Sequence, residues 1–255
     1  MDEVTQRRAK VFGDVAAAYQ RARPTYPMAA VEWMLEPAPG RQVLDLAAGT
    51  GKLTGVLLEA GAEVTAVEPL PGMRAELSAA HPAATVLEGS AEDIPLEDAS
   101  RDAVLVAQAF HWFDVPRALD EMARMLRPGG VVGLTWNLRD DSVDWVAALT
   151  DVLGGAGDTL SAAQPPLDEE EPLSQHPSFR DLRRRGFPNP LPFTRERLRD
   201  WASSTSSVAI LEPAEREKLF DAIDRLCDEH PALRGRETFD VPFVTVCVRA
   251  VRVGR

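Results

Sequence analysis

Between residues 41 and 137, short apolar runs alternate with segments whose apolar side chains recur at the helical period. The runs that we expect to be strands are 43–47, 64–67, 85–87, 103–107 and 131–136. The run 103–107 carries no charge, which is typical of a strand buried on both faces of a parallel sheet. Strands and helices that alternate in this way form βαβ units, so the pattern predicts an α/β fold. We expect a doubly wound, mostly parallel sheet of about seven strands with helices on both faces.

The two flanks of this region are less regular. Residues 5–22 and 28–36 predict helices separated by a proline-rich turn, which we interpret as an N-terminal helical lid. The stretch 154–178 is rich in glycine, proline and acidic residues, which indicates a helical insertion after strand five. The remaining expected elements are helices near 195–203 and 213–229 and a strand at 241–251.

The charge balance argues against nucleic acid as a partner. The chain has 28 basic and 40 acidic residues, a net charge of −12, which a phosphate backbone would repel. We interpret the basic cluster Arg183–Arg185 as a solvated helix face. Cys227 and Cys247 are too few for a disulfide framework, and reduced thiols suit a cytoplasmic protein.

No membrane span, signal peptide or metal site is expected. The sequence has no uncharged apolar stretch of about 18 residues. It opens with Met1-Asp2-Glu3, and no apolar region of the kind found in signal peptides follows. The histidines are scattered without the spacing of metal ligands. Nothing in the sequence specifies an oligomeric state.

The segment 43–54 carries the strongest functional signal, because it runs from a strand through a glycine turn into a helix. In the turn that starts at Ala47, Gly49 and Gly51 let the backbone bend tightly and approach a ligand. The amide groups at the start of the following helix point toward that turn. Asp45 lies within the strand, and Glu68 ends the next strand, where a carboxylate can accept both ribose hydroxyls of an adenosine-containing cofactor.

Two residues bear on which cofactor this is. The fingerprint of dinucleotide-dependent oxidoreductases has glycine or alanine where this sequence has Thr54. The carboxylate of Asp45 beside the turn would repel a pyrophosphate but suits a cationic sulfonium and an α-ammonium group. The pattern therefore favours a cofactor without pyrophosphate. An NAD(P)-dependent oxidoreductase and a non-catalytic cofactor-binding protein stay open as alternatives.

Four segments resemble motifs of class I, Rossmann-like S-adenosylmethionine-dependent methyltransferases, in the same order and at similar spacing. Residues 45–51 resemble the first motif of these enzymes, and Glu68-Pro69 their ribose-binding position. Residues 89–96 resemble the segment that borders the adenine, and 126–130 the turn before the fifth strand. The resemblance implies an enzyme whose cofactor is S-adenosyl-L-methionine.

Two further stretches, 12–27 and 107–114, resemble a narrower group that includes small-molecule and carboxylate methyltransferases of the trans-aconitate type. This resemblance implies a small-molecule acceptor methylated on oxygen, nitrogen or carbon, with a carboxylate among the candidates. It also implies that Gln108 and Ala109 flank the methionine portion of the cofactor. Tyr19 and Arg23 are expected to close over the methionine carboxylate, since a guanidinium is the fork-shaped partner that a carboxylate prefers.

On the adenine side, the resemblance implies that Glu92 or Asp93 accepts a hydrogen bond from the amino group. Ala91 is expected to supply a backbone donor to the ring. Met73 either packs on the adenine or belongs to the core, and the sequence leaves both open.

His111 is a candidate general base, because its ordinary pKa suits proton removal near neutrality. A structural or substrate-packing role is the alternative for this histidine. Trp112 and Phe113 are expected to form an apolar wall of the acceptor pocket together with it. We expect the chain to divide into a lid at 1–40, a cofactor-binding core at 41–137, and insertion helices with completing strands of the same domain at 138–255.

Overall fold

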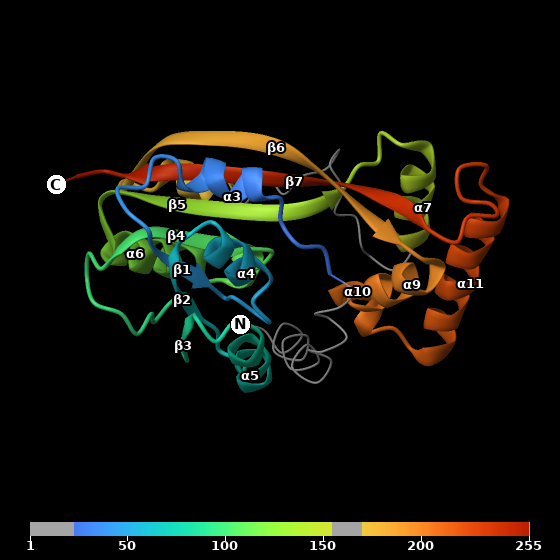
Figure 1. Cartoon of the computed structure of the whole chain (residues 1–255), viewed down its shortest axis with the longest axis horizontal. Coiled ribbons are helices and arrows are strands. Elements are labelled where there is room, and N and C mark those ends of the chain that lie inside the picture. The colour runs from blue at the N-terminus through green and yellow to red at the C-terminus, as the bar shows by residue number, and fades with distance from the viewer. Residues whose placement is uncertain (1–22, 155–169, 255) are drawn as a thin grey trace.

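The computed structural model describes residues 23–154 and 170–254 and contains a seven-stranded sheet (Figure 1). The order of strands across the sheet is β3-β2-β1-β4-β5-β7-β6. Strand β7 runs antiparallel to β5 and β6, and the other neighbouring pairs are parallel. The strands are β1 (Gln42–Leu46), β2 (Glu63–Val67), β3 (Thr85–Leu87), β4 (Arg101–Ala107), β5 (Leu126–Arg139), β6 (Phe179–Phe193) and β7 (Phe239–Arg252). The expected fold class is confirmed.

Helices cover both faces of the sheet, because the central strands are apolar on both sides. Alternate side chains of β4 point into two different clusters: Val104 and Val106 pack with α6, whereas Ala103 and Leu105 pack with α3 and α4. The helices of this part are α3 (Met28–Leu35), α4 (Lys52–Glu59), α5 (Pro71–Ala80), the short 3₁₀ helix η1 (Phe110–Trp112) and α6 (Val115–Met125).

A third apolar cluster lies apart from these two, beyond the carboxyl ends of β5 and β6 (Figure 1). We call it the cap. Its helices are α7 (Asp144–Gly154), α9 (Arg195–Ser203), α10 (Ser206–Ala209) and α11 (Pro213–Glu229), and the outer ends of β6 and β7 complete it. Trp201 contacts both Phe193 and Phe243, with ring centroids 6.5 and 5.7 Å apart. These aromatic contacts join a helix to two long strands and hold the cap to the sheet.

The sequence patterns missed β6. Arg183–Arg185 lie on this strand, so the interpretation as a helix face was wrong, although all three side chains are exposed. Prolines at 188, 190 and 192 argued against a strand, because proline donates no ladder hydrogen bond. They are tolerated because β6 is an edge strand and every second residue turns its nitrogen toward the open edge. Among the residues that alternate with these prolines, Phe187, Asn189 and Phe193 are buried.

The expected start of strand five needs correction, and the expected N-terminal lid remains untested. Strand β5 begins at Leu126 rather than at residue 131, because the Pro128–Gly130 turn forms an irregularity within the pairing with β4. The insertion after strand five contains α7 and α8 (Glu170–Gln175). Most of the expected N-terminal lid lies outside the described residues. Within the described ranges, no helix is both long enough and apolar enough to cross a bilayer.

Candidate active site

The candidate site lies where β1 and β4 are neighbours, although β2 and β3 come between them in the chain. In doubly wound sheets, ligands bind at the carboxyl ends of strands at such a switch point. Ala47 follows β1 and Gln108 follows β4, with φ angles of 56° and 60°. Left-handed backbone at residues other than glycine is strained, and such strain concentrates at ligand sites. Both residues line the same pocket.

The two glycines of the turn have different functions. Gly49 has a φ of +57°, and no atom lies within 4 Å of the position that a β-carbon would occupy there. Its N–H donates to Oε2 of Glu68 at 2.9 Å. Gly51 does not line the pocket. Its φ is +87°, and a β-carbon there would lie 2.6 Å from Cδ2 of His81 and 3.0 Å from Cγ of Leu77. Gly51 therefore allows α5 to pack closely on the turn.

Glu68 is buried at the end of β2, and both of its carboxylate oxygens accept backbone hydrogen bonds. Oε1 accepts from the N–H of Leu70 and Oε2 from that of Gly49, each at 2.9 Å. Burial raises the pKa of Glu68, and these two hydrogen bonds oppose that rise. The carboxylate therefore links the glycine turn to the loop after β2.

Asp45 lies beneath the turn, fully buried, and does not line the pocket. Thr54 Oγ1 donates to its Oδ2 at 2.5 Å, while Oδ1 has no hydrogen-bond partner in the described part of the chain. Burial raises the pKa of Asp45 to about 7. The expectation that this carboxylate faces a sulfonium is therefore not supported. The residue that departs from the oxidoreductase fingerprint, Thr54, is the partner of this buried acid.

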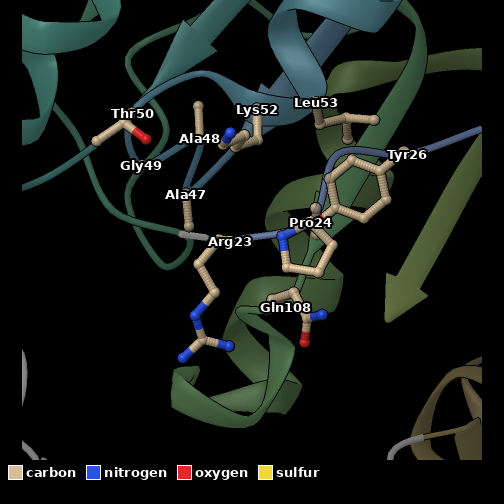
Figure 2. A pocket seen from close by; sticks show the side chains of 11 residues that line it. Arg23, Pro24, Tyr26, Ala47, Ala48, Gly49, Thr50, Lys52, Leu53 and Gln108 are labelled. Carbon is tan, nitrogen blue, oxygen red and sulfur yellow. The ribbon is translucent and has the colours of Figure 1, made fainter. Parts of the chain in front are cut away.

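The pocket beside the turn has a volume of about 60 Å³. Its described lining is Arg23, Pro24, Tyr26, Ala47, Ala48, Gly49, Thr50, Lys52, Leu53, Ala107 and Gln108. Figure 2 shows Arg23 and Gln108 on one side of this pocket, and Thr50 of the glycine turn and Lys52 of α4 on the other. None of these described lining residues is acidic, although the whole chain carries a net charge of −12.

Arg23 joins the pocket to the cap, because its guanidinium donates to the backbone oxygen of Ser204 at 2.7 Å. A partly buried polar network holds the neighbouring lining residues. Asn137 and Asn189 both donate to the backbone oxygen of Thr25, at 3.2 and 2.8 Å. Thr245 Oγ1 donates to Asn137 Oδ1 at 2.5 Å. Strands β5, β6 and β7 therefore fix the segment that contains Arg23 and Tyr26. Sequence reasoning could not find this network, because Asn189 lies on the missed strand.

His111 and Trp112 lie on η1, directly after β4, with ring centroids 4.9 Å apart, and Phe113 follows. Desolvation of the ring by the protein atoms around it, with the positive charge of Arg23, lowers the pKa of His111 to about 4, although part of the residue is exposed. The imidazole is therefore neutral near pH 7 and only weakly basic. Ala109, which precedes η1, packs against the core. An acceptor-pocket role for these residues stays a prediction.

The residues expected around the adenine occupy a loop and a neighbouring helix. Met73 and Ala91 are buried. Glu92 accepts the N–H of Asp114 at 2.8 Å, so its carboxylate already fixes the loop to α6. Asp93 is exposed and bridges to Ser90 through its backbone. Tyr19 lies outside the described residues. Which of these side chains contacts the adenine stays a prediction.

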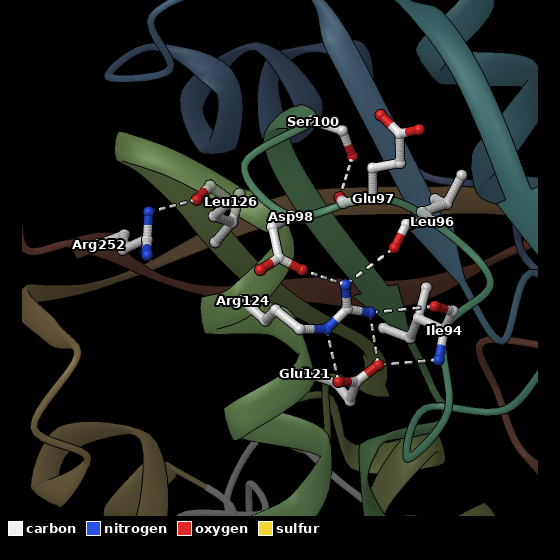
Figure 3. Close-up of polar contacts among 9 residues, drawn as sticks. All are labelled: Ile94, Leu96, Glu97, Asp98, Ser100, Glu121, Arg124, Leu126 and Arg252. Carbon is white, nitrogen blue, oxygen red and sulfur yellow. Dashed lines mark hydrogen bonds and ion pairs between the residues drawn. The ribbon is translucent and has the colours of Figure 1, made fainter.

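Arg124 of α6 anchors the same loop from outside, which the sequence did not indicate (Figure 3). Its guanidinium donates to the backbone oxygens of Ile94 and Leu96 at 3.1 and 2.9 Å, and to Asp98 at 2.7 Å. Two further bonds of 2.7 Å join it to Glu121, whose Oε2 also accepts the N–H of Ile94. Hydrogen bonding to Arg124 lowers the pKa of Glu121.

Comparisons with known proteins assign the chain to a family. Residues 44–134 match the model of a methyltransferase domain. An uncharacterised methyltransferase of Mycobacterium tuberculosis (strain H37Rv) is 45% identical over 240 residues, which are 94% of each chain. The chain therefore belongs to the Rossmann-like, S-adenosylmethionine-dependent methyltransferases, as residues 45–51 indicated.

Two further relatives help to place it. A solved structure from Anaeromyxobacter dehalogenans, assigned to the type II methyltransferases, has a TM-score of 0.66 and 27% identity. The match covers 91% of this chain and 97% of that one. A malonyl-[acyl-carrier protein] O-methyltransferase of Pectobacterium atrosepticum is 37% identical over 141 residues, 54% of this chain and 55% of that protein.

Proposed function

We propose that the protein transfers the methyl group of S-adenosyl-L-methionine to a carboxylate oxygen of a small-molecule acceptor. The observation that carries this proposal is the cationic pocket beside the glycine turn, which has Arg23 and Lys52 in its described lining and no acidic residue there. Such a pocket favours anions; with Arg23 assigned to the methionine carboxylate of the cofactor, Lys52 is left for an anionic acceptor. The related malonyl-[acyl-carrier protein] enzyme, which matches about half of this chain, carries the name of an O-methyltransferase and gives independent support.

The residues around the turn fit the cofactor. Glu68 is buried and does not line the pocket in this structure, but each of its oxygens accepts one backbone N–H and has a second acceptor site, with which the carboxylate can take two ribose hydroxyls. Ala47, Ala48 and Gly49 have little or no side chain, so a ligand can approach the backbone. Arg23 would bind the methionine carboxylate, and Gln108 would flank the methionine chain.

The bound cofactor supplies a methyl group on a positively charged sulfur. The acceptor oxygen forms a bond to that carbon as the carbon–sulfur bond breaks, which gives a methyl ester and a neutral thioether. A carboxylate is already deprotonated near pH 7, so no general base is needed. The low pKa of His111, about 4, is consistent with a residue that positions or covers the acceptor and removes no proton. The protein then acts by alignment and by exclusion of water.

Product chemistry tests this proposal. The protein is incubated with methyl-deuterated S-adenosylmethionine and a panel of mono- and dicarboxylic acids, amines and phenols, and the products are identified by mass spectrometry. We expect labelled products among the carboxylic acids only, and alkali should release labelled methanol because esters hydrolyse. Alkali-stable products from the amines or phenols would contradict a carboxylate acceptor. Cofactor binding without any product would favour the non-catalytic alternative.

A matched pair of variants tests the cofactor site. Glu68→Gln keeps the shape of a buried side chain but removes its charge, and we expect binding of S-adenosylhomocysteine to weaken by about 1–3 kcal/mol. Glu88→Gln is the control, because Glu88 is an exposed acid that pairs with Arg74 near the same loop. Unchanged affinity in Glu68→Gln would remove Glu68 from the site.

A further inference from the structure

The backbone oxygen of Thr25 accepts hydrogen bonds from the only two asparagines of the chain. Asn137 donates to it from β5 at 3.2 Å, and Asn189 donates to it from β6 at 2.8 Å. The two side chains also contact each other, because Nδ2 of Asn189 donates to Oδ1 of Asn137 at 3.2 Å. Thr245 of β7 donates to the same Oδ1 at 2.5 Å. Three neighbouring strands therefore converge on one backbone oxygen near the start of the described chain.

Thr25 lies between residues that face the pocket. Arg23, Pro24 and Tyr26 line the pocket, as Figure 2 shows, whereas Thr25 is not among the described lining residues. Pro24 and Pro27 restrict the backbone φ angles on either side of Thr25, so this segment is stiff. Hydrogen bonds that fix the backbone of Thr25 therefore also fix the side chains next to it, which face the ligand.

The network formed by Asn137, Asn189 and Thr245, which we call the asparagine network, contains more polar groups than the stability of this segment requires. One hydrogen bond satisfies a backbone oxygen, and Thr25 is an exposed residue that water can reach. The side chains of Asn189 and Thr245 are nevertheless buried, and a buried polar group is costly unless it is hydrogen-bonded. A fully bonded polar network specifies one arrangement of the chain around it. The network therefore specifies where the segment 23–26 lies.

The asparagine network also reaches Gln108, on the same side of the pocket as Arg23 (Figure 2). Nε2 of Gln108 donates to the backbone oxygen of Asn137 at 3.3 Å. Asn137 therefore contacts both parts of the wall that is assigned to the methionine chain of the cofactor. Glu68, which is assigned to the ribose, is held instead by the backbone N–H groups of the glycine turn and of the loop after β2.

We propose that Asn137, Asn189 and Thr245 are positioning residues for the cofactor, because they hold the segment 23–26 where Arg23 meets the methionine carboxylate. This inference rests on the proposed function and extends it: the two halves of the cofactor site are held separately. Glu68 and the glycine turn form the ribose half, and the asparagine network holds the methionine half. The three positioning residues act through Arg23 and Gln108 and not by contact with the cofactor.

Calorimetry with two ligands tests this inference. S-adenosylhomocysteine carries the amino-acid chain with its carboxylate, whereas 5′-methylthioadenosine has the same adenosine and sulfur without that chain. We expect Asn189→Ala to weaken the binding of S-adenosylhomocysteine about tenfold and to change the binding of 5′-methylthioadenosine by about twofold or less. Glu68→Gln should weaken the binding of both ligands, since both contain the ribose. A general loss of structure would weaken both ligands alike in Asn189→Ala.

Two threonines of neighbouring strands provide a matched pair of variants. Thr245→Val and Thr135→Val each remove a fully buried hydroxyl between β5 and β7. Thr245 donates to the side chain of Asn137, whereas Thr135 donates to the backbone oxygen of Val246 at 3.2 Å. The two variants should lose similar stability in thermal unfolding. Only Thr245→Val should weaken the binding of S-adenosylhomocysteine, by about three- to tenfold.

A double variant tests whether Asn189 acts through Arg23. In an Arg23→Met background, Asn189→Ala should have little further effect on the binding of S-adenosylhomocysteine, because the two changes remove the same interaction. An effect as large as in the wild type would overturn the inference.

Two other results would also overturn it: equal weakening of both ligands in Asn189→Ala, or equal S-adenosylhomocysteine affinity in Thr245→Val and Thr135→Val. The second result applies even if Asn189→Ala does not fold. Failure of the wild type to bind either adenosyl ligand is a different outcome. It would overturn the proposed function itself, and this inference with it.

Discussion

The cofactor end of the molecule and the cap use charge in opposite ways. At the cofactor end, Asp45 and Glu68 are buried, and their partners are a hydroxyl and backbone amides. In the cap the interior is mainly apolar and aromatic, and its buried charge is a cation, Arg139, which lies over the ring of Trp201 and donates to Thr150. Charged pairs such as Arg195 with Asp228 lie at the exposed surface between α9 and α11. Buried acids are costly unless their environment is fixed, whereas exposed pairs contribute little to stability.

This difference indicates a division of labour. The buried acids of the cofactor end require a rigid turn, which suits a ligand of constant shape. The cap is held by apolar contacts that tolerate substitution of similar volume, which suits a region that differs among enzymes with different acceptors. The pocket takes Arg23, Lys52 and Gln108 from the core side, and Arg23 reaches the cap through Ser204. The experiments below perturb one end and examine the other.

The largest effect is expected from Trp201→Ala in the cap. Trp201 is buried against Phe193 and Phe243, so truncation should lower the free energy of unfolding by about 3–5 kcal/mol. If the two ends are as separate as the clusters indicate, the folded variant should still bind S-adenosylhomocysteine with nearly wild-type affinity. Ile210→Ala is the control, because Ile210 is 45% exposed, and its effect should stay within about 0.5 kcal/mol. Complete loss of cofactor binding in folded Trp201→Ala would show that the two ends are coupled.

The next effect concerns the glycine turn. Gly51→Ala adds a β-carbon at a φ of +87° and 2.6 Å from His81, so we expect a loss of about 2–4 kcal/mol in unfolding free energy and weaker cofactor binding. Gly61→Ala has a similar φ of +77° but nothing within 4 Å, so strain alone should cost about 1 kcal/mol. Thermal and urea unfolding measure both. His81→Ala should restore part of the stability of Gly51→Ala. Equal effects of the two glycine variants would contradict the packing role.

The pH dependence of stability reports on Asp45. Its pKa rises from 3.8 to about 7 on folding, so the folded state favours the protonated form. Its stabilising contribution is therefore fully present below pH 3.8, falls as the pH rises toward about 7, and is constant above that. Asp45→Asn stays neutral, so its unfolding free energy should fall less than that of the wild type across this range, by about 4 kcal/mol. Urea denaturation at several pH values measures both unfolding free energies. An equal change with pH in the two proteins would contradict the raised pKa.

The smallest effect is expected from Arg124 of α6, which lies outside the loop that was expected to border the adenine. Arg124→Met removes the donor that fixes Ile94 and Leu96, and should cost about 1–2 kcal/mol in unfolding free energy. Amide hydrogen exchange at Ile94 should accelerate, because Glu121 loses the partner that orients it. Arg252→Met is the control, since Arg252 donates to the backbone oxygen of Leu126 and not to the loop. Similar exchange in both variants would mean that Arg124 does not order the loop.

The same division explains what the sequence could predict. The elements of the cofactor end follow from local patterns, because apolar runs, helical period and a glycine turn each lie within a few residues. The strand expected at 64–67, for example, is β2 and spans Glu63–Val67. Strand β6 was missed, because its edge position, which makes three prolines acceptable, depends on contacts with β7 that no local pattern records.

The same limit applies to the site. Gly51 was assigned to the ligand because a glycine pattern does not reveal whether a ligand or a histidine occupies the space beside it. Asp45 was assigned to the sulfonium because its pairing with Thr54 is visible only in three dimensions. Lys52, which directly follows Gly51 in the motif, could have been found from the sequence, since a cation beside a ligand turn is itself a signal.

The most direct test of the central claim is calorimetric titration of the wild type and Glu68→Gln with S-adenosylhomocysteine and, separately, with NAD. We expect S-adenosylhomocysteine to bind the wild type and to bind Glu68→Gln more weakly, by about 1–3 kcal/mol, and NAD to bind neither protein. Binding of NAD, or the absence of S-adenosylhomocysteine binding to the wild type, would contradict the assignment of the glycine turn and Glu68 to an adenosyl cofactor without pyrophosphate.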